Sequence, residues 1–161
     1  MNALSNLEKL TIHPASQDDW KEILKLMEET GRTFYFSGKE SYEKFYVVKD
    51  PDTQNILCAF ELEIKAPVAV LKYLGVKKSL QGKGIGKYVV NKVPELLKNK
   101  AVRRLYASTW ESHSFWEKTD YKEIRIKDVK DEFFKAYLSE LEKGYPEKFH
   151  NLLKNYLVEI D

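Results

Sequence analysis

The sequence predicts an α/β domain, and three observations support that fold class. An apolar segment at residues 71–76 passes through a glycine-rich turn at 81–86 directly into an amphipathic helix. Segments with the two-residue period of a strand and the 3.6-residue period of a helix lie on both sides of it. A chain of 161 residues, 43% of them hydrophobic, is large enough to bury one core.

The N-terminal quarter of the chain predicts a strand, a helix and an irregular segment. Residues 7–12 predict a strand. Ser16 and Asp19 have the spacing of a capping box, so a helix is expected to begin there and to end near Gly31. Residues 32–43 are aromatic and irregular, which predicts a short second helix with loops.

The central strands come next. Residues 45–49 and 56–64 predict two strands, which the turn at 50–52 joins as an antiparallel hairpin. Pro67 separates this hairpin from a further strand at 68–76.

The second half begins with the helix after the glycine turn. That helix is expected over residues 84–99, and Pro94 is expected to kink or restart it. A strand at 103–108, a short helix at 112–119 and a strand at 121–127 follow.

The tail leaves one alternative open. Residues 133–138 fit either a helix or a final strand, because aromatic residues favour both. Residues 147–158 predict a second amphipathic helix. Its apolar face would consist of Phe149, Leu152, Leu153, Tyr156 and Leu157.

The glycine turn carries the strongest chemical signal. In Gln81-x-x-Gly84-x-Gly86, backbone N–H groups without side-chain cover point outward at a helix start, where the helix dipole also favours anions. This arrangement is typical of a site for a diphosphate-bearing cofactor. Residues 87–89 are Lys-Tyr-Val. The turn therefore lacks the Lys-Ser/Thr of nucleoside-triphosphate-binding loops and the third glycine of the dinucleotide-binding motif.

The run at residues 70–90 resembles the acetyl-CoA-binding motif of the GNAT (Gcn5-related N-acetyltransferase) superfamily, Gln/Arg-x-x-Gly-x-Gly/Ala after a strand of the form Leu-x-Val. Residues 10–27, 103–109 and 114–124 are similar to the family's opening strand and first helix, its fifth strand and its Phe-Tyr-Glu-Lys-x-Gly-Phe segment. The resemblance implies the GNAT fold, a mixed and mostly antiparallel central sheet with helices on both faces. It would occupy residues 1–127, and residues 128–161 would add a final strand or a helical C-terminal extension packed on the same domain.

The resemblance also implies acetyl-CoA as co-substrate. The backbone of the fourth strand would pair with the pantetheine arm, and the turn would hold the diphosphate. Gln81 would order the turn and contact phosphate through its side-chain amide. The residues expected to contact acetyl-CoA are Leu74, Gly75, Val76, Gln81, Gly82, Lys83, Gly84, Ile85, Gly86, Lys87 and Thr109.

Transfer to an amine requires a base, because an ammonium has no lone pair and a free lysine titrates near ~10.4. The histone-acetylating branch of the family has a Glu near the start of the fourth strand, where this chain has Val70. Glu61 and Glu63 share one face of the preceding strand and are the next candidates, although they could equally be a solvent-facing pair.

The proton donor is the second departure from the family. The family's Tyr, which often protonates the leaving thiolate, is replaced by Trp116, whose indole N–H donates a hydrogen bond but does not release its proton near neutrality. The proton would then come from Tyr73, Tyr106 or water, or the chain would be a slow or inactive relative.

These observations predict an enzyme, an N-acetyltransferase in which a primary amine of a small molecule or a protein attacks acetyl-CoA directly. Two alternatives stay open: a catalytically weak or inactive acyl-CoA sensor, and an interaction module that forms a homodimer through its tail helices.

Composition narrows the function classes further. The net charge of +2, with acids and bases interspersed, does not favour nucleic acid. No segment is long and apolar enough for a membrane span or a signal core, which predicts a cytoplasmic protein. The single cysteine, Cys58, and three widely spaced histidines predict no metal site.

Overall fold

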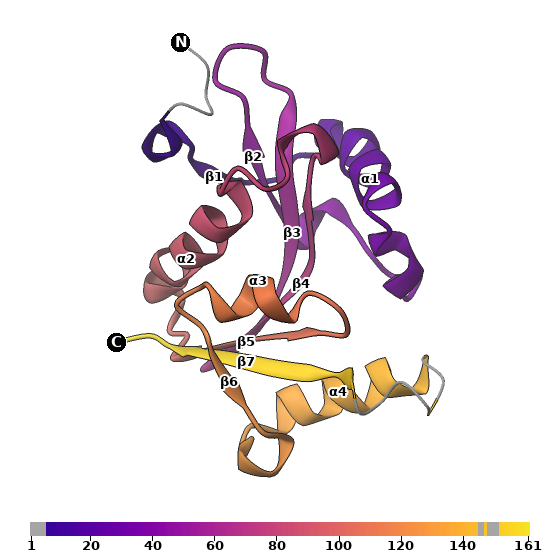
Figure 1. Ribbon diagram of the computed structural model, residues 1–161, viewed down its shortest axis with the longest axis vertical. Helices are drawn as coiled ribbons and strands as arrows, with labels where there is room; N and C mark the ends of the chain where they lie inside the picture. The colour runs from indigo at the N-terminus through magenta and orange to yellow at the C-terminus, as the bar shows by residue number, and fades with distance from the viewer. Residues whose placement is uncertain (1–5, 145–146, 148–151) are drawn as a thin grey trace. The chain divides into compact units, whose positions relative to one another are not determined.

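The structure is a computed structural model that describes residues 6–144, 147 and 152–161 (Figure 1). The strands are β1 (Ile12–Pro14), β2 (Phe45–Lys49), β3 (Ile56–Lys65), β4 (Val68–Val76), β5 (Arg104–Thr109), β6 (Lys122–Ile124) and β7 (Lys154–Glu159). The α-helices are α1 (Trp20–Glu29), α2 (Ile85–Leu97), α3 (His113–Glu117) and α4 (Glu132–Lys143).

The chain divides into two compact units. The first unit holds the described residues up to Leu62 together with Lys72–Val89. The second unit holds Glu63–Leu71 and the described residues from Val90 onward. The strands β3 and β4 and the helix α2 therefore contribute residues to both units.

The described strands form a seven-stranded sheet in the order β1-β2-β3-β4-β5-β7-β6. In the first unit, β1 pairs with β2 and β2 with β3, both antiparallel. In the second unit, β4 pairs with β5 in parallel, and β7 pairs antiparallel with both β5 and β6. This mixed sheet with its helices confirms the predicted α/β class.

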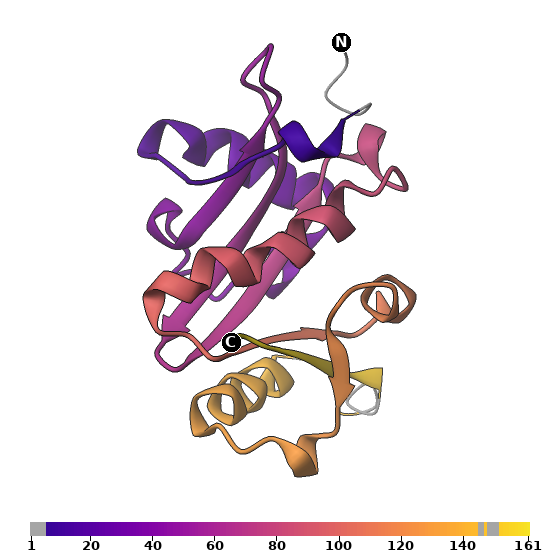
Figure 2. The ribbon, with the colours of Figure 1, turned by 90° about the vertical axis from the view of Figure 1, so that its left-hand side faces the viewer.

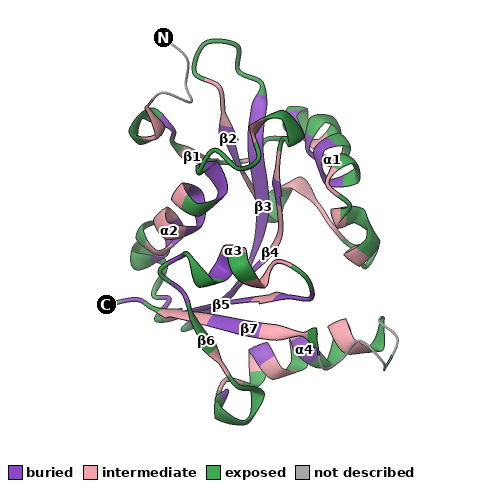
Figure 3. Cartoon of the chain, viewed as in Figure 1, coloured by how far each residue is buried: buried purple, intermediate pink, exposed green. Residues whose placement is uncertain are grey.

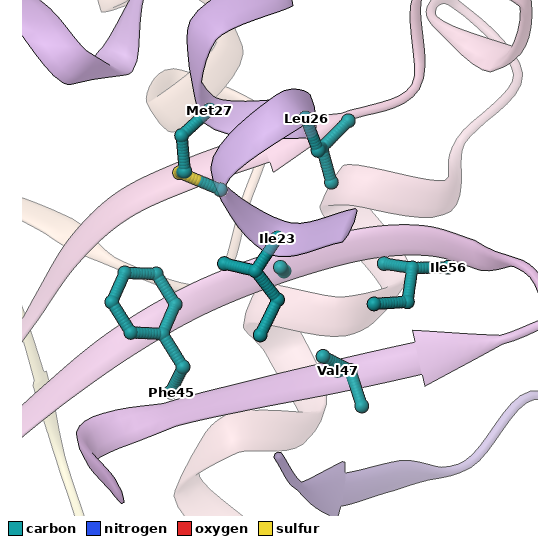
Figure 4. Packing of buried hydrophobic residues seen from close by; sticks show 7 residues of the cluster. Ile23, Leu26, Met27, Phe45, Val47 and Ile56 are labelled. Atoms are coloured by element: carbon teal, nitrogen blue, oxygen red, sulfur yellow. The ribbon is translucent and has the colours of Figure 1, made fainter. Parts of the chain in front are cut away.

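The core of the first unit lies between α1 and two strands. The capping box expected at the helix start is present, with the Ser16 N–H and hydroxyl donating to Asp19 Oδ2 at 2.9 and 3.1 Å. Ile23, Leu26 and Met27 of α1 point toward β2 and β3 (Figure 4). The ribbon views show α1 beside these two strands (Figures 1 and 2). The cluster consists of Ile23, Leu26, Met27, Phe45, Val47, Ile56 and Ala59.

Gly75 of β4 lets α1 approach the strand closely. A Cβ placed on Gly75 would lie 2.9 Å from Met27 Cε and 3.0 Å from Thr30 Oγ1, closer than real side chains pack. The glycine at this position is therefore required by packing against α1.

Replacing Gly75 with Ala, and more strongly with Val, is expected to destabilise the protein by about 1–3 kcal/mol, because an overpacked core forces α1 outward. Urea unfolding measures the effect. In a double-mutant cycle, Met27→Ala should lower the free energy of unfolding less in the Gly75→Ala background than in the wild type. The reason is that it removes the Met27 Cε methyl group, which would clash with the new Cβ. Additive costs would show that the clash with Met27 is not the cause.

The core of the second unit joins α4 to β4 and β5. Phe134 and Leu138 pack with Val68, Val70 and Tyr106, and the rings of Tyr106 and Phe134 stack at 4.1 Å. Residues 133–138 therefore belong to a helix, which resolves the alternative that the sequence left open (Figure 3).

A polar network fixes the start of α4 to β5. Arg104 Nε and Nη2 donate to the two carboxylate oxygens of Asp131 at 2.7 and 2.9 Å, and the Tyr106 hydroxyl donates to Oδ2 at 2.6 Å. The hydrogen bonds from Arg104 are the main reason that the pKa of Asp131 is lowered, although partial burial opposes them.

Asp131→Asn is expected to lower stability by about 1–2 kcal/mol at neutral pH, because it removes the charge that pairs with Arg104. A lowered pKa in the folded state means that this stabilisation is present above about pH 4 and is lost as pH falls through the lowered value. The difference in Tm between wild type and variant should therefore narrow below about pH 4. A difference that stays constant down to pH ~2 would contradict the assignment.

The helix α2 continues through Pro94. Proline lacks an N–H and leaves the carbonyl four residues earlier, that of Val90, without its helical donor. The buried hydroxyl of Tyr121 donates to this carbonyl at 2.9 Å. This tertiary hydrogen bond replaces the missing helical donor, and α2 does not restart at Pro94, which was one of the two outcomes expected there.

Three sequence predictions are wrong in detail. Residues 7–12 form a 3₁₀ turn at Leu7–Lys9, and the strand begins only at Ile12. The strand expected at 121–127 is limited to β6 and ends in a 3₁₀ turn at Ile126–Asp128. The short helix within 32–43 consists of two 3₁₀ turns, Arg32–Tyr35 and Tyr42–Lys44.

The helix predicted at 147–158 is the largest error. Its last part is the strand β7, which pairs with β5 along its whole length and with β6 over residues 155–157. Phe149, assigned to that helix, lies outside the described residues. Among the helices described, none has the length and apolar content that a membrane span requires.

Candidate functional site

The end of β4 has an unusual backbone. Its parallel register with β5 covers Val68–Leu71, and Tyr73 then adopts a left-handed conformation with φ of 56°. A bulky residue with positive φ bends a strand locally and is uncommon outside functional or strained sites. The candidate coenzyme residues Leu74, Gly75 and Val76 follow directly.

Two carbonyls of this strand end accept hydrogen bonds from side chains. Arg32 Nε donates to the Leu74 carbonyl at 2.8 Å, and Gln81 Nε2 donates to the Val76 carbonyl at 3.0 Å. The Gln81 contact ties the turn back to the strand. Each carbonyl has two lone pairs, so a further hydrogen bond to a ligand remains possible.

The glycine turn presents backbone N–H groups at the start of α2. Gly82 and Gly84 have φ of 79° and 87°, conformations that residues with a Cβ rarely adopt, and α2 begins at Ile85. In the described part of the chain, the N–H groups of residues 82–87 donate no hydrogen bond, and the first bond of the helix joins Tyr88 N–H to Gly84.

The space around the two glycines is open. A Cβ on Gly82 would meet no described atom within 4 Å, and one on Gly84 would meet only Leu7 Cδ1, at 3.6 Å. Lys83, between the two glycines, and Lys87, in the first turn of α2, are exposed. Open N–H groups, a helix start and two exposed lysines of the same segment together form an arrangement that can bind a phosphate-bearing ligand.

The loop before β2 is attached to β4 through Tyr73 and Glu40. The Tyr73 hydroxyl lies 3.0 Å from Glu40 Oε2 and 3.4 Å from the Tyr35 carbonyl. Burial opposes ionisation of Glu40, but hydrogen bonds from the N–H groups of Ser37 and Gly38 outweigh it and lower its pKa. Since its hydroxyl is hydrogen-bonded to Glu40, Tyr73 could protonate a thiolate only after that bond had broken.

The two candidate bases differ in environment. Glu61 is 4% exposed, and its carboxylate lies 3.7 Å from the Lys72 ammonium. It stands opposite Phe45, so its side chain points to the face of β3 that α1 covers. Glu63 is half-buried. Glu61 is therefore not the solvent-facing residue that the sequence allowed.

In the second unit, Thr109 and Trp116 are held by local contacts. Thr109 Oγ1 accepts hydrogen bonds from the N–H groups of Glu111 and Ser112, at 3.3 and 2.8 Å, and so shapes the turn into α3. Trp116 is 5% exposed and packs its ring edge-on against Tyr121 at 5.0 Å. The described His, Cys, Asp and Glu side chains form no group of three or more that could hold a metal ion.

The family follows from a direct comparison. Residues 16–121 match the sequence model of the Acetyltransferase (GNAT) family. This range contains the end of β4, the glycine turn and α3. The chain belongs to the GNAT family. The resemblance noted in the sequence is thereby confirmed, and a comparison with curated proteins found no match.

Solved structures share the GNAT fold at low sequence identity. N-acetylglutamate synthase from Neisseria gonorrhoeae, complexed with coenzyme A and N-acetyl-glutamate, has a TM-score of 0.73 and 12% identity over 94% of this chain. This chain spans only 35% of that enzyme. A Mycobacterium tuberculosis protein in complex with CoA has a TM-score of 0.67 and 17% identity over 94% of this chain and 99% of its own.

A third structure, spermidine N-acetyltransferase from Vibrio cholerae in complex with CoA and spermine, has a TM-score of 0.59. It is 17% identical over 73% of this chain and 83% of its own. At such identities the likeness establishes the fold alone.

Sequence reasoning missed several contacts in this GNAT chain. Glu40 lies in a region without periodicity, so nothing marked it as a partner of Tyr73. The hydrogen bond from the Tyr121 hydroxyl to the Val90 carbonyl, which Pro94 leaves without a helical donor, joins residues 31 positions apart. No local sequence pattern indicates such a contact. Tyr156 was assigned to a helix, and residues 154–159 lack the period-two alternation that would have marked a strand.

Proposed function

We propose that this GNAT chain transfers the acetyl group of acetyl-CoA to a primary amine, with the amine attacking the thioester directly. The observation that carries the proposal is the turn before α2, in which two left-handed glycines leave a series of N–H groups open to a ligand. These groups would hold the diphosphate of coenzyme A, and Lys83 and Lys87 would add positive charge.

The strand end would receive the pantetheine arm. Leu74, Gly75 and Val76 are the last residues of β4. They follow Tyr73, whose left-handed backbone changes the direction of the strand at this point. Solved GNAT structures that contain CoA support this assignment by likeness of fold. Thr109 is a further candidate contact, because it terminates β5 and shapes the following turn.

Glu61 is the preferred base. An acceptor amine must lose a proton before or during attack, and a buried carboxylate beside an ammonium group can take it directly or through water. Glu63, which is less buried, is the alternative. Trp116 stands in the sequence where the family often has a proton-donating Tyr, and it would not itself supply a proton.

The acceptor class is open between small amines, polyamines, amine-containing antibiotics and protein N-termini. A thiol-release assay with acetyl-CoA over a panel of these amines tests the function directly. Calorimetry with acetyl-CoA in the absence of amine tests binding separately. Binding with release of thiol supports the transferase. Binding without transfer to any amine would favour the acyl-CoA sensor, and no binding would overturn both.

A further inference from the structure

Tyr73 has a strained backbone inside a strand. Three described residues other than glycine have a positive φ. Gln54 and Ala101 lie in connections between elements, whereas Tyr73, with φ of 56°, lies within β4. An aromatic residue in the left-handed region is energetically unfavourable and persists there only where its surroundings impose that conformation. The contacts of its side chain are therefore the place to look for the cause.

The Tyr73 side chain is held at both ends. Its ring packs edge-on against Phe36, with centroids 4.8 Å apart, and stacks on Phe45 at 6.3 Å. Its hydroxyl lies 3.0 Å from Glu40 Oε2. The ring contacts belong to the core of the first unit, whereas the hydroxyl contact connects β4 to the segment before β2. Glu40 is thus the polar end of the attachment.

Glu40 is itself fixed in place. Its Oε2 accepts hydrogen bonds from the N–H and the hydroxyl of Ser37 at 2.9 and 3.0 Å, and its Oε1 accepts one from the Gly38 N–H at 2.8 Å. Burial opposes its ionisation, but these hydrogen bonds outweigh burial and lower the pKa of Glu40. A charged acceptor forms a stronger hydrogen bond than a neutral one, so the carboxylate is a rigid and strong partner for the Tyr73 hydroxyl.

We propose that Glu40 is a positioning residue that holds Tyr73 in its left-handed conformation and so shapes the end of β4 for coenzyme A, a role that rests on the function proposed above. The residues that would pair with the pantetheine arm, Leu74–Val76, follow Tyr73 directly. The same segment before β2 is attached to them a second time, because Arg32 Nε donates to the Leu74 carbonyl at 2.8 Å. Glu40 acts through Tyr73 and does not touch the reacting atoms.

The role of Glu40 predicts that coenzyme affinity and stability respond differently to its loss. Without the hydrogen bond to Glu40, the backbone of Tyr73 relaxes to an extended conformation, and the relief of strain offsets the lost bond, so Tm changes little. Coenzyme A binds only the bent strand end, so its apparent affinity falls with the fraction of molecules that stay bent. A residue that only stabilised the fold would lower Tm and leave the affinity unchanged.

Tyr73→Phe removes only the hydroxyl. Calorimetry with free coenzyme A should show an affinity about tenfold lower than that of wild type, with Tm within about 2 °C. Glu40→Ala should lower the affinity equally and add nothing to Tyr73→Phe in the double variant, because the two residues share one interaction. Glu22→Ala is the matched control, since the Glu22 carboxylate accepts the Ile56 N–H at 2.6 Å and joins α1 to β3 in the same unit. It should lower Tm and leave the affinity unchanged.

A second comparison tests the backbone conformation itself. Asparagine adopts the left-handed conformation more readily than phenylalanine. Glu40→Ala/Tyr73→Asn should therefore bind coenzyme A more tightly than Glu40→Ala/Tyr73→Phe, although it loses the ring contacts with Phe36 and Phe45 and should have the lower Tm. Equal or weaker binding by the asparagine variant would overturn the proposal.

A third readout needs no ligand. The NMR coupling between the amide and α protons of residue 73 reports its φ, and it should change from the left-handed to the extended value in Tyr73→Phe. If wild type binds coenzyme A and Tyr73→Phe binds it equally well, the proposal is overturned. If wild type binds none, the function proposed above fails. An unchanged coupling would then overturn the role of Glu40 as well, whereas a changed coupling would support Glu40 as the residue that holds the bend.

Discussion

Replacing Gly84 with Val is expected to abolish binding of coenzyme A while the protein stays folded. Gly84 has a φ of 87°, which a β-branched residue adopts only at a cost, so the N–H groups before α2 would turn away from a common ligand. Hydrogen bonds to a charged group contribute about 1.5–3 kcal/mol each, and the loss of two lowers affinity by about 100-fold or more.

Gly31→Val is the matched control. Gly31 has a φ of 75°, and a Cβ there would meet no described atom within 4 Å, so the backbone strain is similar but lies after α1. Calorimetry with acetyl-CoA and thermal unfolding should be measured for both variants. We expect similar losses in Tm and a loss of affinity in Gly84→Val alone. Unchanged affinity in folded Gly84→Val would remove the turn from the coenzyme site.

A chain that ends at residue 151 is expected to lose the cooperative folding of the second unit. It lacks β7, which pairs with β5 over Arg104–Thr109 and with β6 over Lys122–Ile124. Without it, β6 has no described strand partner, and the buried residues Asn155, Tyr156 and Ile160 are removed. A strand between two others contributes hydrogen bonds and apolar burial on both sides. Removing it therefore lowers the free energy of unfolding more than removing an exposed tail would.

Circular dichroism and hydrogen exchange resolved by residue would follow the truncated chain. Two point variants in the same segment calibrate the result. Tyr156→Ala should cost about 3–5 kcal/mol because it empties a fully buried site. Leu152→Ala, at a residue that is 46% exposed, should change stability by less than about 0.5 kcal/mol. A truncated chain with unaltered cooperative unfolding would show that β7 is dispensable.

Local sequence patterns were sufficient to predict the elements whose conformation depends on residues close in sequence. The hairpin of β2 and β3 was predicted from two strand-like segments and the turn between them, and β4 and the start of α2 from an apolar run followed by glycines. Each depends on residues close in sequence, since turn geometry and period are local properties. The glycine turn was found for the same reason, because its backbone conformation requires residues without a Cβ.

The sequence by itself thus determined the α/β class, the strand-turn-helix unit and the family to which these residues belong. Only the tertiary structure decided that the tail forms β7, because aromatic and aliphatic residues fit a helix or a strand until β5 and β6 provide hydrogen-bonding edges. It also decided that the Tyr121 hydroxyl donates to the Val90 carbonyl at Pro94, and that the Tyr156 hydroxyl has no hydrogen-bond partner among the described residues. Hydrogen bonds between residues far apart in the chain depend on where the fold places them, and no local pattern encodes them.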